Sequence, residues 1–287
     1  MTLDEVRVNI DRVDKQIKEL FQERMELADQ VAQIKAQTGD QIFKPDREEA
    51  IIQKLTADIV PGIKREYIAL IKRIMEVSRK YQYGRTLELR DCLDVEWKET
   101  NERALQVAMV KSELYICDMV SKDSVITVEA FEEIGELIAE GKADAGIGIM
   151  EDVSIGVSDE LHQTLVKKKL FINTCKVIED NGVRKKVVMF GKDLIVDAKD
   201  NRMKVMFVCR NRSGSLASIL SMVSDYDVNL TEIHSRPNGK AEWNYEFYLE
   251  FEGNLQKKEI QALIFQLRNE TQYFQILGSY FCEGDFS

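Results

Sequence analysis

The sequence is poor in several residue types on which whole classes of protein depend. Its 287 residues include two histidines and five cysteines, and no two cysteines form a Cys-x-x-Cys pair. A histidine-rich metal site, a dithiol redox motif or a Ser/His/Asp triad therefore has little material here. We expect no metal and no cofactor, and we expect the cysteines to be reduced packing residues.

Long apolar runs and an excess of positive charge are also absent. No stretch approaches the ~18 apolar residues of a membrane span, and the N-terminal segment lacks the layout of a signal peptide. The chain carries 40 Lys and Arg against 50 Asp and Glu. Because nucleic acid requires a clearly basic face, whereas a small anion needs only a few cations, we expect a cytoplasmic protein with no nucleic-acid and no membrane partner.

Residues 3–34 repeat apolar side chains with the period of a helix that packs against other helices. The apolar positions follow one another mostly at steps of three and four, at Leu3, Val6, Ile10, Val13, Ile17, Leu20, Leu27, Val31 and Ile34. A helix of about 32 residues is roughly 48 Å long, which is more than two short helices of the same chain can cover. We therefore expect a partner chain to cover the remainder, in a homodimer or a higher homo-oligomer.

Two further helices are predicted after the first. Gly39-Asp40 ends the long helix, and Pro45 with the acidic residues that follow it is typical of a new helix start. Pro61-Gly62 ends the second helix. The third helix, expected to reach residue 82, places Ser78 and Gln82 one turn apart on one face.

Arg24 stands where the apolar repeat of the first helix is interrupted. An arginine on an apolar face must find partners, because desolvation of its charge is costly. Lys35 follows eleven residues later, on nearly the same face. Together with Arg7 and Arg47, these cations fit a pocket for a ligand with more than one carboxylate. The periodicity is equally consistent with an Arg24 that pairs with a buried acid or extends outward.

After residue 85 the sequence pattern changes. Between residues 104 and 200, short apolar runs at 104–110, 113–120, 143–150 and 185–190 alternate with helical or polar stretches, as in an α/β lobe. Residues 203–284 fit the strand-helix-strand-strand-helix-strand order of a ferredoxin-like domain. We predict a multidomain chain with an all-α helical domain (1–85), a central α/β lobe (86–200) and a C-terminal α+β ferredoxin-like domain (201–287).

The helical segment resembles the all-helical class of chorismate mutases. The resemblance rests on Pro45-Asp46-Arg47-Glu48 and on a set of spaced positions, namely Arg7, Asp11, Asp14, Leu20, Arg24, Leu27, Ala28, Val31, Lys35, Ser78 and Gln82. It implies conversion of chorismate to prephenate by an intertwined homodimer with two equivalent sites. It also implies that Arg7 enters the partner's site and, with Arg24 and Arg47, holds the substrate carboxylates, assisted by Ser78.

The same resemblance assigns roles around the substrate ring and the breaking bond. Glu48 would accept a hydrogen bond from the ring hydroxyl, while Lys35 and Gln82 would face the ether oxygen. Lys44 stands where an aspartate can occur in this family, which affects a peripheral hydroxyl contact. The rearrangement is concerted and needs no nucleophile, metal or proton shuttle, so fixed donors that stabilise charge on the ether oxygen suffice.

The order of the three segments resembles the bifunctional chorismate mutase–prephenate dehydratases of phenylalanine synthesis. The last segment resembles their ACT domain, which implies that phenylalanine binds as an effector. The effector positions would be Gly214, Ser215, Leu216, Asn229, Leu230, His234, Ser235, Arg236 and Pro237. The family usually has glutamate where His234 stands. A ligand-free, ACT-like dimerisation module is the alternative interpretation.

The central segment resembles only part of a prephenate dehydratase. Residues 131–133, 143–147 and 149–152 look like its first lobe and residues 179–181 like its closing segment, whereas the second lobe is missing. The family's Thr-Arg-Phe triplet has its best match in Lys185-Lys186-Val187, without the threonine hydroxyl. We therefore expect no dehydratase activity from this degenerate lobe.

These observations predict a chorismate mutase of phenylalanine biosynthesis that phenylalanine inhibits through the ACT domain. One alternative is an active bifunctional chorismate mutase/prephenate dehydratase. Another is a non-catalytic aromatic amino-acid sensor. The complete set of expected site residues argues against that last alternative.

Overall fold

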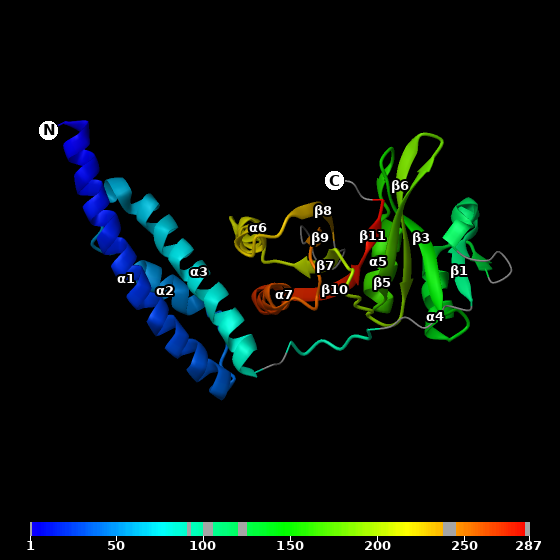
Figure 1. The fold of residues 1–287 in the computed structure, drawn as a ribbon, viewed down its shortest axis with the longest axis horizontal. Coiled ribbons are helices and arrows are strands. Elements are labelled where there is room, and N and C mark those ends of the chain that lie inside the picture. The colour runs from blue at the N-terminus through cyan, green and yellow to red at the C-terminus, as the bar shows by residue number, and fades with distance from the viewer. Residues whose placement is uncertain (1, 91–92, 100–105, 120–124, 238–244, 285–287) are drawn as a thin grey trace. The chain divides into compact units, whose positions relative to one another are not determined.

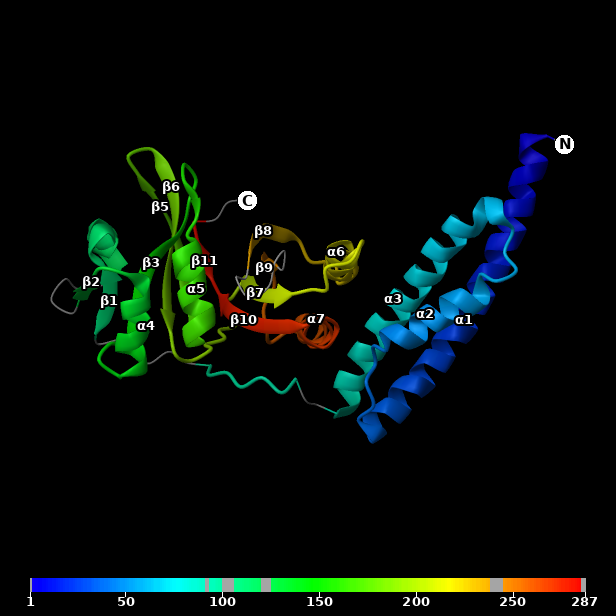
Figure 2. The same cartoon turned by 180° about the vertical axis from the view of Figure 1, so that it is seen from behind.

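The computed structural model describes residues 2–90, 93–99, 106–119, 125–237 and 245–284. The chain divides into two compact units, residues 1–93 and residues 94–287. We call them the helical unit and the α/β unit; Figures 1 and 2 show them from opposite sides. Within the described residues, no helix combines the length and the apolar character needed to cross a membrane.

The helical unit consists of α1 (Leu3–Thr38), α2 (Pro45–Leu55), the short 3-10 helix η1 (Pro61–Ile63) and α3 (Lys64–Arg90). A capping box of Thr2 and Glu5 begins α1, and Gly39, with a left-handed φ of 73°, ends it. Pro45 begins α2 at a position where no helical N–H is needed. The N-terminal turns of α1 extend past the other helices (Figures 1 and 2).

The apolar face of α1 is largely uncovered in the single chain. Its only buried residues among those described are Ala28 and Ala32. Half or more of the surface of Ile17, Leu20 and Leu27 remains exposed. A soluble monomer rarely exposes so long an apolar stripe, so this face has the character of a surface made to be covered.

The third helix is longer than the sequence predicted. It continues beyond residue 82 to Arg90, and the boundary between the units lies at residue 93 rather than 85. Tyr83, Thr86 and Leu87 are buried, so tertiary packing supports the two additional turns.

The described residues of the α/β unit form one sheet of eleven strands. Their order is β2-β1-β3-β6-β5-β10-β7-β9-β8, with β4 beside β3 and β11 beside β5. The first strands are β1 (Val107–Val110), β2 (Val125–Val128), β3 (Ala145–Asp152), β4 (Gly156–Val157), β5 (Phe171–Asp180) and β6 (Val183–Gly191). The helices of this part are η2 (Lys111–Met119), α4 (Phe131–Ala139) and α5 (Asp159–Lys168).

One apolar run adopted a different structure from the one its pattern suggested. Residues 113–120 read as one of the strand-like runs, but residues 111–119 form the 3-10 helix η2. Parallel pairing of β1 with both β2 and β3 fills both edges of β1, so this run does not pair with β1.

The last part of the chain has the predicted order of elements. It consists of β7 (Arg202–Val208), α6 (Ser215–Asp225), β8 (Leu230–Pro237), β9 (Tyr245–Glu252), α7 (Lys258–Glu270), β10 (Tyr273–Tyr280) and β11 (Cys282–Glu283). Its strands lie side by side as β10-β7-β9-β8, all antiparallel. This βαββαβ arrangement is the ferredoxin-like one.

The predicted boundary between residues 200 and 201 lies inside the α/β unit. Strand β10 pairs with β5 at Gly278 and Ile172, and β11 pairs with β5 at Cys282 and Cys175. These pairings join the central and C-terminal strands in one sheet. One hydrophobic core accordingly contains side chains from both segments, such as Phe190 and Tyr280.

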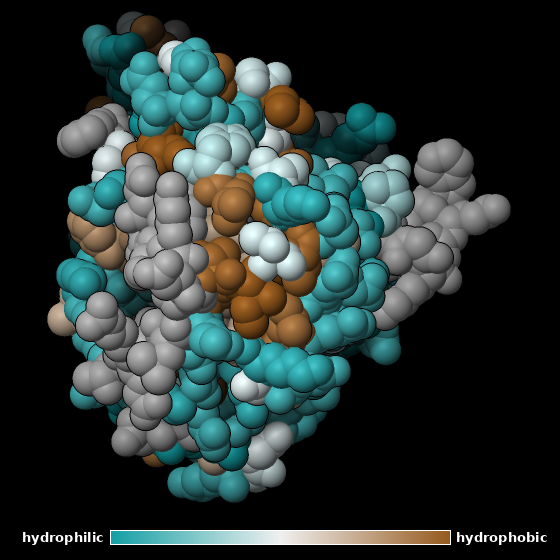
Figure 3. All heavy atoms as spheres, turned by 90° about the vertical axis from the view of Figure 1, so that its right-hand side faces the viewer, coloured by the Kyte–Doolittle hydropathy of each residue, from teal (hydrophilic) through white to brown (hydrophobic). Residues whose placement is uncertain are grey.

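Strand β2 forms one edge of the sheet. Figure 3 shows this side of the molecule, where apolar side chains gather in a patch bordered by hydrophilic residues. The side chains of β2 are half-buried or exposed, and Leu114 and Tyr115 of the adjacent η2 are exposed. Among the described residues, the sheet has no further strand beyond β2.

Candidate functional site

A pocket in the helical unit brings together seven of the eight residues expected to bind substrate. It has a volume of about 160 Å³ and is lined by all three long helices and by the segment that precedes α2. The expected residues in its wall are Arg24, Lys35, Lys44, Arg47, Glu48, Ser78 and Gln82. The other lining residues are Val31, Ile42, Ile51, Met75 and Arg79.

Helical spacing explains why these side chains converge. Arg24 and Lys35 are three turns apart on one face of α1, and Val31 lies between them in the pocket wall. Arg47 and Glu48 occupy the first turn of α2, which Pro45 begins.

Within the part of the chain that the structure describes, Arg24 forms no ion pair with a buried acid, and its side chain does not extend into solvent. Its guanidinium donates to the Ser78 hydroxyl and, at 3.5 Å, to the backbone carbonyl of Ile74. Burial lowers the pKa of Arg24, and the nearby Glu48 carboxylate partly opposes this shift. Ser78 therefore holds the Arg24 guanidinium at the pocket wall.

Lys35 is a half-buried cation. Its ammonium donates to the backbone carbonyl of Ile42 at 3.0 Å. Burial is the main cause that lowers the pKa of Lys35 below its ordinary 10.5. The positive charges of Lys44 and Arg47 act in the same direction, while Asp40 and Glu48 oppose it.

Arg79 is the site residue that the sequence reading missed. It is 6% exposed, and its guanidinium donates to both carboxylate oxygens of Glu48 at 2.6 and 2.7 Å. The guanidinium carbon also lies 4.7 Å from the centre of the Phe43 ring. In the sequence, Arg79 directly follows Ser78, an expected site residue. Helical periodicity does not predict that an adjacent residue shares its face, so the sequence alone gave no reason to assign Arg79 to the pocket.

The pocket has a strong excess of positive charge. Lys44 pairs with Asp40 at 2.5 Å, and Arg79 pairs with Glu48. Among the described residues, the other three cations, Arg24, Lys35 and Arg47, form no ion pair. Cations held together without carboxylate partners are suited to a small ligand that carries two negative charges.

Gln82 adds a polar group to the wall. Its side-chain oxygen is buried and accepts no hydrogen bond from any described residue. Because the two ends of a glutamine amide are interchangeable by rotation, this group can offer either a donor or an acceptor to a bound ligand.

Arg7 lies outside the pocket. Its side chain is 66% exposed and pairs with Asp4, 3.3 Å away, one turn earlier on α1. It precedes Arg24 by seventeen residues, or roughly 25 Å along the helix. Arg7 therefore cannot reach the pocket of its own chain.

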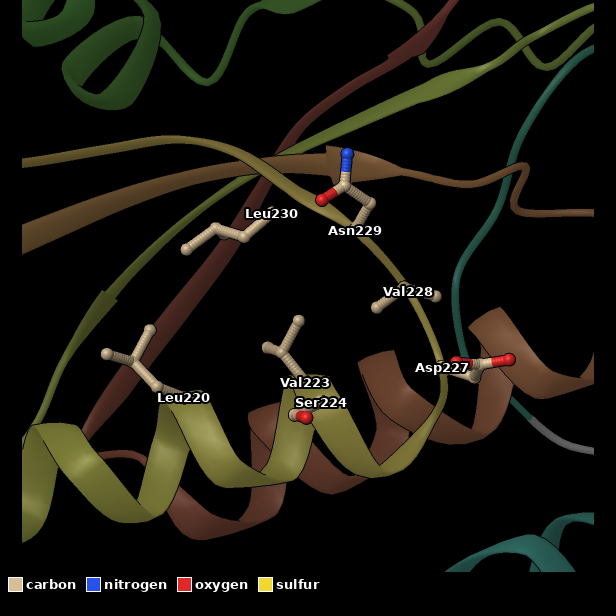
Figure 4. Close-up of a pocket in the computed structure, with 7 residues that line it drawn as sticks. All are labelled: Leu220, Val223, Ser224, Asp227, Val228, Asn229 and Leu230. Carbon is tan, nitrogen blue, oxygen red and sulfur yellow. The ribbon is translucent and has the colours of Figure 1, made fainter.

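The C-terminal part of the α/β unit contains a second hollow, of about 480 Å³ (Figure 4). Leu220, Val223 and Ser224 of α6 face Asn229 and Leu230 across it. Asn229 and Leu230 are expected effector residues. The other seven, Gly214, Ser215, Leu216, His234, Ser235, Arg236 and Pro237, do not line this hollow.

Two of those other effector residues contact the helix α5. The His234 imidazole lies 2.9 Å from the carboxylate of Asp159 at the start of α5. Arg236 donates to the Asp159 backbone carbonyl at 3.4 Å. Gly214, by contrast, has a left-handed φ of 85° and is the residue that precedes the first turn of α6.

The residues that align with the dehydratase triplet are engaged in internal ion pairs. Lys186 lies 3.3 Å from Glu151 and 3.2 Å from the buried Glu250 of β9. Lys185 pairs with Asp180 at 2.8 Å and also donates to the hydroxyl of Tyr115 at 2.8 Å. These lysines therefore hold the sheet together rather than face an open cleft.

The fold and the pocket define a class of protein in which a helical unit with a cationic pocket precedes a dehydratase-like α/β unit. Residues 6–83 match the family described as chorismate mutase type II. A bifunctional chorismate mutase/prephenate dehydratase of Aquifex aeolicus is 22% identical over 97% of this chain and 97% of its own length. Residues 6–83 are therefore similar to chorismate mutases of type II, and the whole chain is similar to a bifunctional enzyme.

Solved structures of prephenate dehydratases are similar in fold to the α/β unit. The prephenate dehydratase from Streptococcus mutans aligns with a TM-score of 0.54 and 18% identity, over 62% of this chain and 99% of that one. A prephenate dehydratase from Arthrobacter aurescens, in complex with L-Phe, aligns with a TM-score of 0.50 and 13% identity, over 61% of this chain and 90% of that one. At these identities the similarity is one of fold.

The comparison with the Aquifex relative also reveals a difference in length. The alignment spans 354 positions, whereas this chain has 287 residues. At least 67 positions of the alignment therefore have no residue of this chain. This chain is thus the shorter version of the bifunctional arrangement.

Proposed function

We propose that this protein is a chorismate mutase of aromatic amino-acid biosynthesis, an isomerase that converts chorismate to prephenate. The observation that carries the proposal is the set of three cations without carboxylate partners, Arg24, Lys35 and Arg47, around one pocket of the mutase domain. Chorismate carries two carboxylates, and its rearrangement needs no nucleophile or metal. The charge of the pocket suits it.

Each residue of the pocket has a role in this proposal. Arg24, held by Ser78, and Arg47 bind the substrate carboxylates. Lys35 and the amide of Gln82 donate to the ether oxygen, on which negative charge grows as the carbon–oxygen bond lengthens. Donors fixed in a partly buried pocket stabilise this charge more than water does, because they need no reorientation during the reaction.

The active form in this proposal is a homodimer. The exposed apolar face of α1 supports it, since pairing with a second copy would bury that face. Arg7 also supports it, because this exposed arginine cannot reach its own pocket and is free to complete the site of the other chain. Lys44 borders the substrate only at the periphery.

Phenylalanine is the proposed effector of the mutase, with inhibition as its effect. The ferredoxin-like arrangement of residues 202–280 and the fold similarity to a dehydratase in complex with L-Phe support an ACT domain here. The hollow beside Asn229 and Leu230 is open to a small apolar amino acid. His234, which is engaged with Asp159, is the position at which this chain departs from the family.

We further propose that the chain has no prephenate dehydratase activity. The lysines at the triplet positions are neutralised by internal carboxylates, and residues 185–187 include no threonine whose hydroxyl could donate a proton. The shorter length relative to the Aquifex enzyme agrees with loss of a lobe.

A chorismate-consumption assay on the purified chain, with and without phenylalanine, tests these proposals. We expect prephenate as the sole product, at a rate that phenylalanine lowers. Phenylpyruvate among the products would instead establish an active bifunctional enzyme. No consumption of chorismate, together with binding of phenylalanine, would establish a non-catalytic sensor.

A further inference from the structure

Among the described residues that line the pocket, Glu48 carries the one negative charge, whereas Arg24, Lys35, Lys44, Arg47 and Arg79 are cations. Its field acts on both Arg24 and Lys35, whose pKa values it raises against the effect of burial. An unrestrained carboxylate at this position would share the pocket with three cations that form no ion pair among the described residues, Arg24, Lys35 and Arg47. In the absence of substrate, Glu48 would then tend to form ion pairs with the cations that are proposed to bind the substrate.

Arg79 prevents such pairing, because it already binds the carboxylate of Glu48. It approaches Glu48 from α3 and contacts both carboxylate oxygens, at 2.6 and 2.7 Å. The Arg79 side chain is 7% exposed and that of Glu48 is 23% exposed, so solvent screens this pair only weakly. Such a pair is shorter and stronger than a surface ion pair.

The guanidinium of Arg79 is itself held on a second side. The Phe43 ring lies against it at 4.7 Å, in the segment that leads into α2. Arg79 therefore connects α3 to the beginning of α2, the turn that presents Glu48. A planar guanidinium can stack on a ring and bind a carboxylate at once, which an ammonium cannot do.

We propose that Arg79 is a positioning residue of the mutase site, which holds Glu48 away from the substrate-binding cations and aims it at the ring hydroxyl of the substrate. The inference rests on the proposed mutase function. It makes Arg79 the residue that sets selectivity for a hydroxylated ring, although Arg79 need not touch the substrate. It also explains how Arg24, Lys35 and Arg47 remain available for carboxylates when the pocket is empty.

The test compares kcat/KM for chorismate with kcat/KM for an analogue that lacks the ring hydroxyl. We expect the wild-type chain to prefer chorismate by about 10- to 100-fold, as for other hydrogen bonds to a charged acceptor. Arg79→Gln is expected to lower this ratio to that of Glu48→Gln, mainly through the value for chorismate. Arg79→Lys, which keeps the charge but has no planar group to stack on the Phe43 ring, should restore only part of the ratio.

Arg85→Gln is the matched control. Arg85 also lies on α3 and pairs with a carboxylate of α1, Asp29, at 3.0 Å, but it does not line the pocket. The Arg85→Gln substitution should leave unchanged the ratio of kcat/KM for chorismate to kcat/KM for the analogue. If Arg85→Gln lowers the ratio as much as Arg79→Gln does, the effect belongs to the helix packing and the inference is wrong.

A double variant covers the case in which Arg79→Gln alone does not fold. Glu48→Gln with Arg79→Gln removes both charges of the pair, so no buried charge is left without a partner. We expect its substrate ratio to equal that of Glu48→Gln, because Arg79 acts through Glu48. A further loss for chorismate in the double variant would overturn the inference.

The outcomes distinguish this inference from the proposed function. A wild-type chain that rearranges neither substrate would refute the mutase proposal, and this inference with it. An active wild-type chain whose preference for the hydroxylated substrate survives Arg79→Gln would refute the role of Arg79 alone.

Discussion

Lys35 is the residue on which the chemical step should depend most directly. Its ammonium is half-buried in the pocket and can face the ether oxygen. We expect Lys35→Ala to lower the mutase kcat by about 100-fold or more, as loss of a preorganised donor does elsewhere, while the protein remains folded. Steady-state kinetics and circular dichroism measure both effects.

Lys72→Ala is a suitable control for that experiment, because Lys72 is an exposed lysine of α3 outside the pocket. Its kcat should match that of the wild type. A fully active Lys35→Ala variant would refute the assignment of the catalytic group.

The ionisation of Lys35 also predicts an alkaline limit to activity. Burial and the nearby cations lower the pKa of Lys35 below 10.5, and only the protonated form is a cation that can stabilise the ether oxygen. The value of kcat/KM should therefore fall as the pH rises, at a lower pH than an ordinary lysine would give. The pH profile of the free enzyme measures this limit.

Lys35→Arg separates Lys35 from other titrating groups, because arginine keeps its charge at all accessible pH values. If the variant retains activity, its alkaline limit should move to higher pH. An unchanged limit would assign the titration to another residue.

At the scale of elements, the junction between β5 and β10 depends on a glycine. A Cβ at Gly278 would overlap the backbone carbonyl oxygen of Ile172 in β5. We expect Gly278→Ala to destabilise the α/β unit by about 1–3 kcal/mol, because backbone must move to accommodate it. Faster hydrogen exchange of the β5 and β10 amides would locate the effect at this junction.

Gly84→Ala provides the opposite case in the helical unit. Gly84 lies within α3, and a Cβ there meets no atom within 4 Å. Since alanine favours a helix over glycine by about 1 kcal/mol, this variant should be slightly stabilised. A Gly278→Ala variant as stable as the wild type would mean that the two strands are not in close contact.

Glu250 of β9 predicts how the α/β unit responds to acid. Burial opposes its ionisation, but Lys204 and Lys186, with hydrogen bonds from Tyr280 and Thr231, lower its pKa from 4.5 to about 2. A carboxyl whose pKa is lower in the folded state contributes stability above pH 4.5 and loses it as the pH falls toward 2. The shift corresponds to about 3 kcal/mol.

Urea unfolding between pH 7 and pH 3 measures this contribution. Glu250→Gln should be clearly destabilised at pH 7, because it removes the buried carboxylate that Lys186 contacts and leaves Lys186 with Glu151 alone, and the difference from wild type should shrink in acid. Glu136→Gln, which removes an exposed ion pair with Lys168, should follow the wild-type curve. Parallel pH curves for wild type and Glu250→Gln would contradict this interpretation.

At the scale of the whole molecule, the exposed face of α1 predicts self-association. We expect Ile17→Glu with Leu20→Glu to convert a dimer into monomers, because two carboxylates would be buried in the interface. Mutase activity should fall with dissociation, since Arg7 could no longer reach a partner's pocket. Sedimentation velocity and the chorismate assay, run on the same samples, check both.

Val8→Glu controls for the change in charge, because Val8 is equally exposed but points to the opposite side of α1 by helical spacing. It should leave the oligomeric state unchanged. A wild-type chain that sediments as a monomer with full activity would refute the proposed dimer.

Local patterns were sufficient for the parts of this protein that depend on nearby residues. The period of the apolar positions and the residues at the helix ends predicted α1 and α2 and the start of α3, because helix formation depends on contacts three and four residues apart. The same spacing predicted that Arg24 and Lys35 share a face. Resemblance to a known family supplied Glu48, Ser78 and Gln82, which the structure brings into the same pocket.

Contacts between distant residues decided the rest. The Arg79–Glu48 pair joins positions 31 residues apart on different helices, and the pairing of β5 with β10 and β11 merges two predicted segments into one sheet. No period in the sequence encodes such contacts, because they depend on how whole elements pack. The sequence by itself determined which helix carries the cations, whereas only the tertiary structure decided which of them are neutralised and which remain available for a ligand.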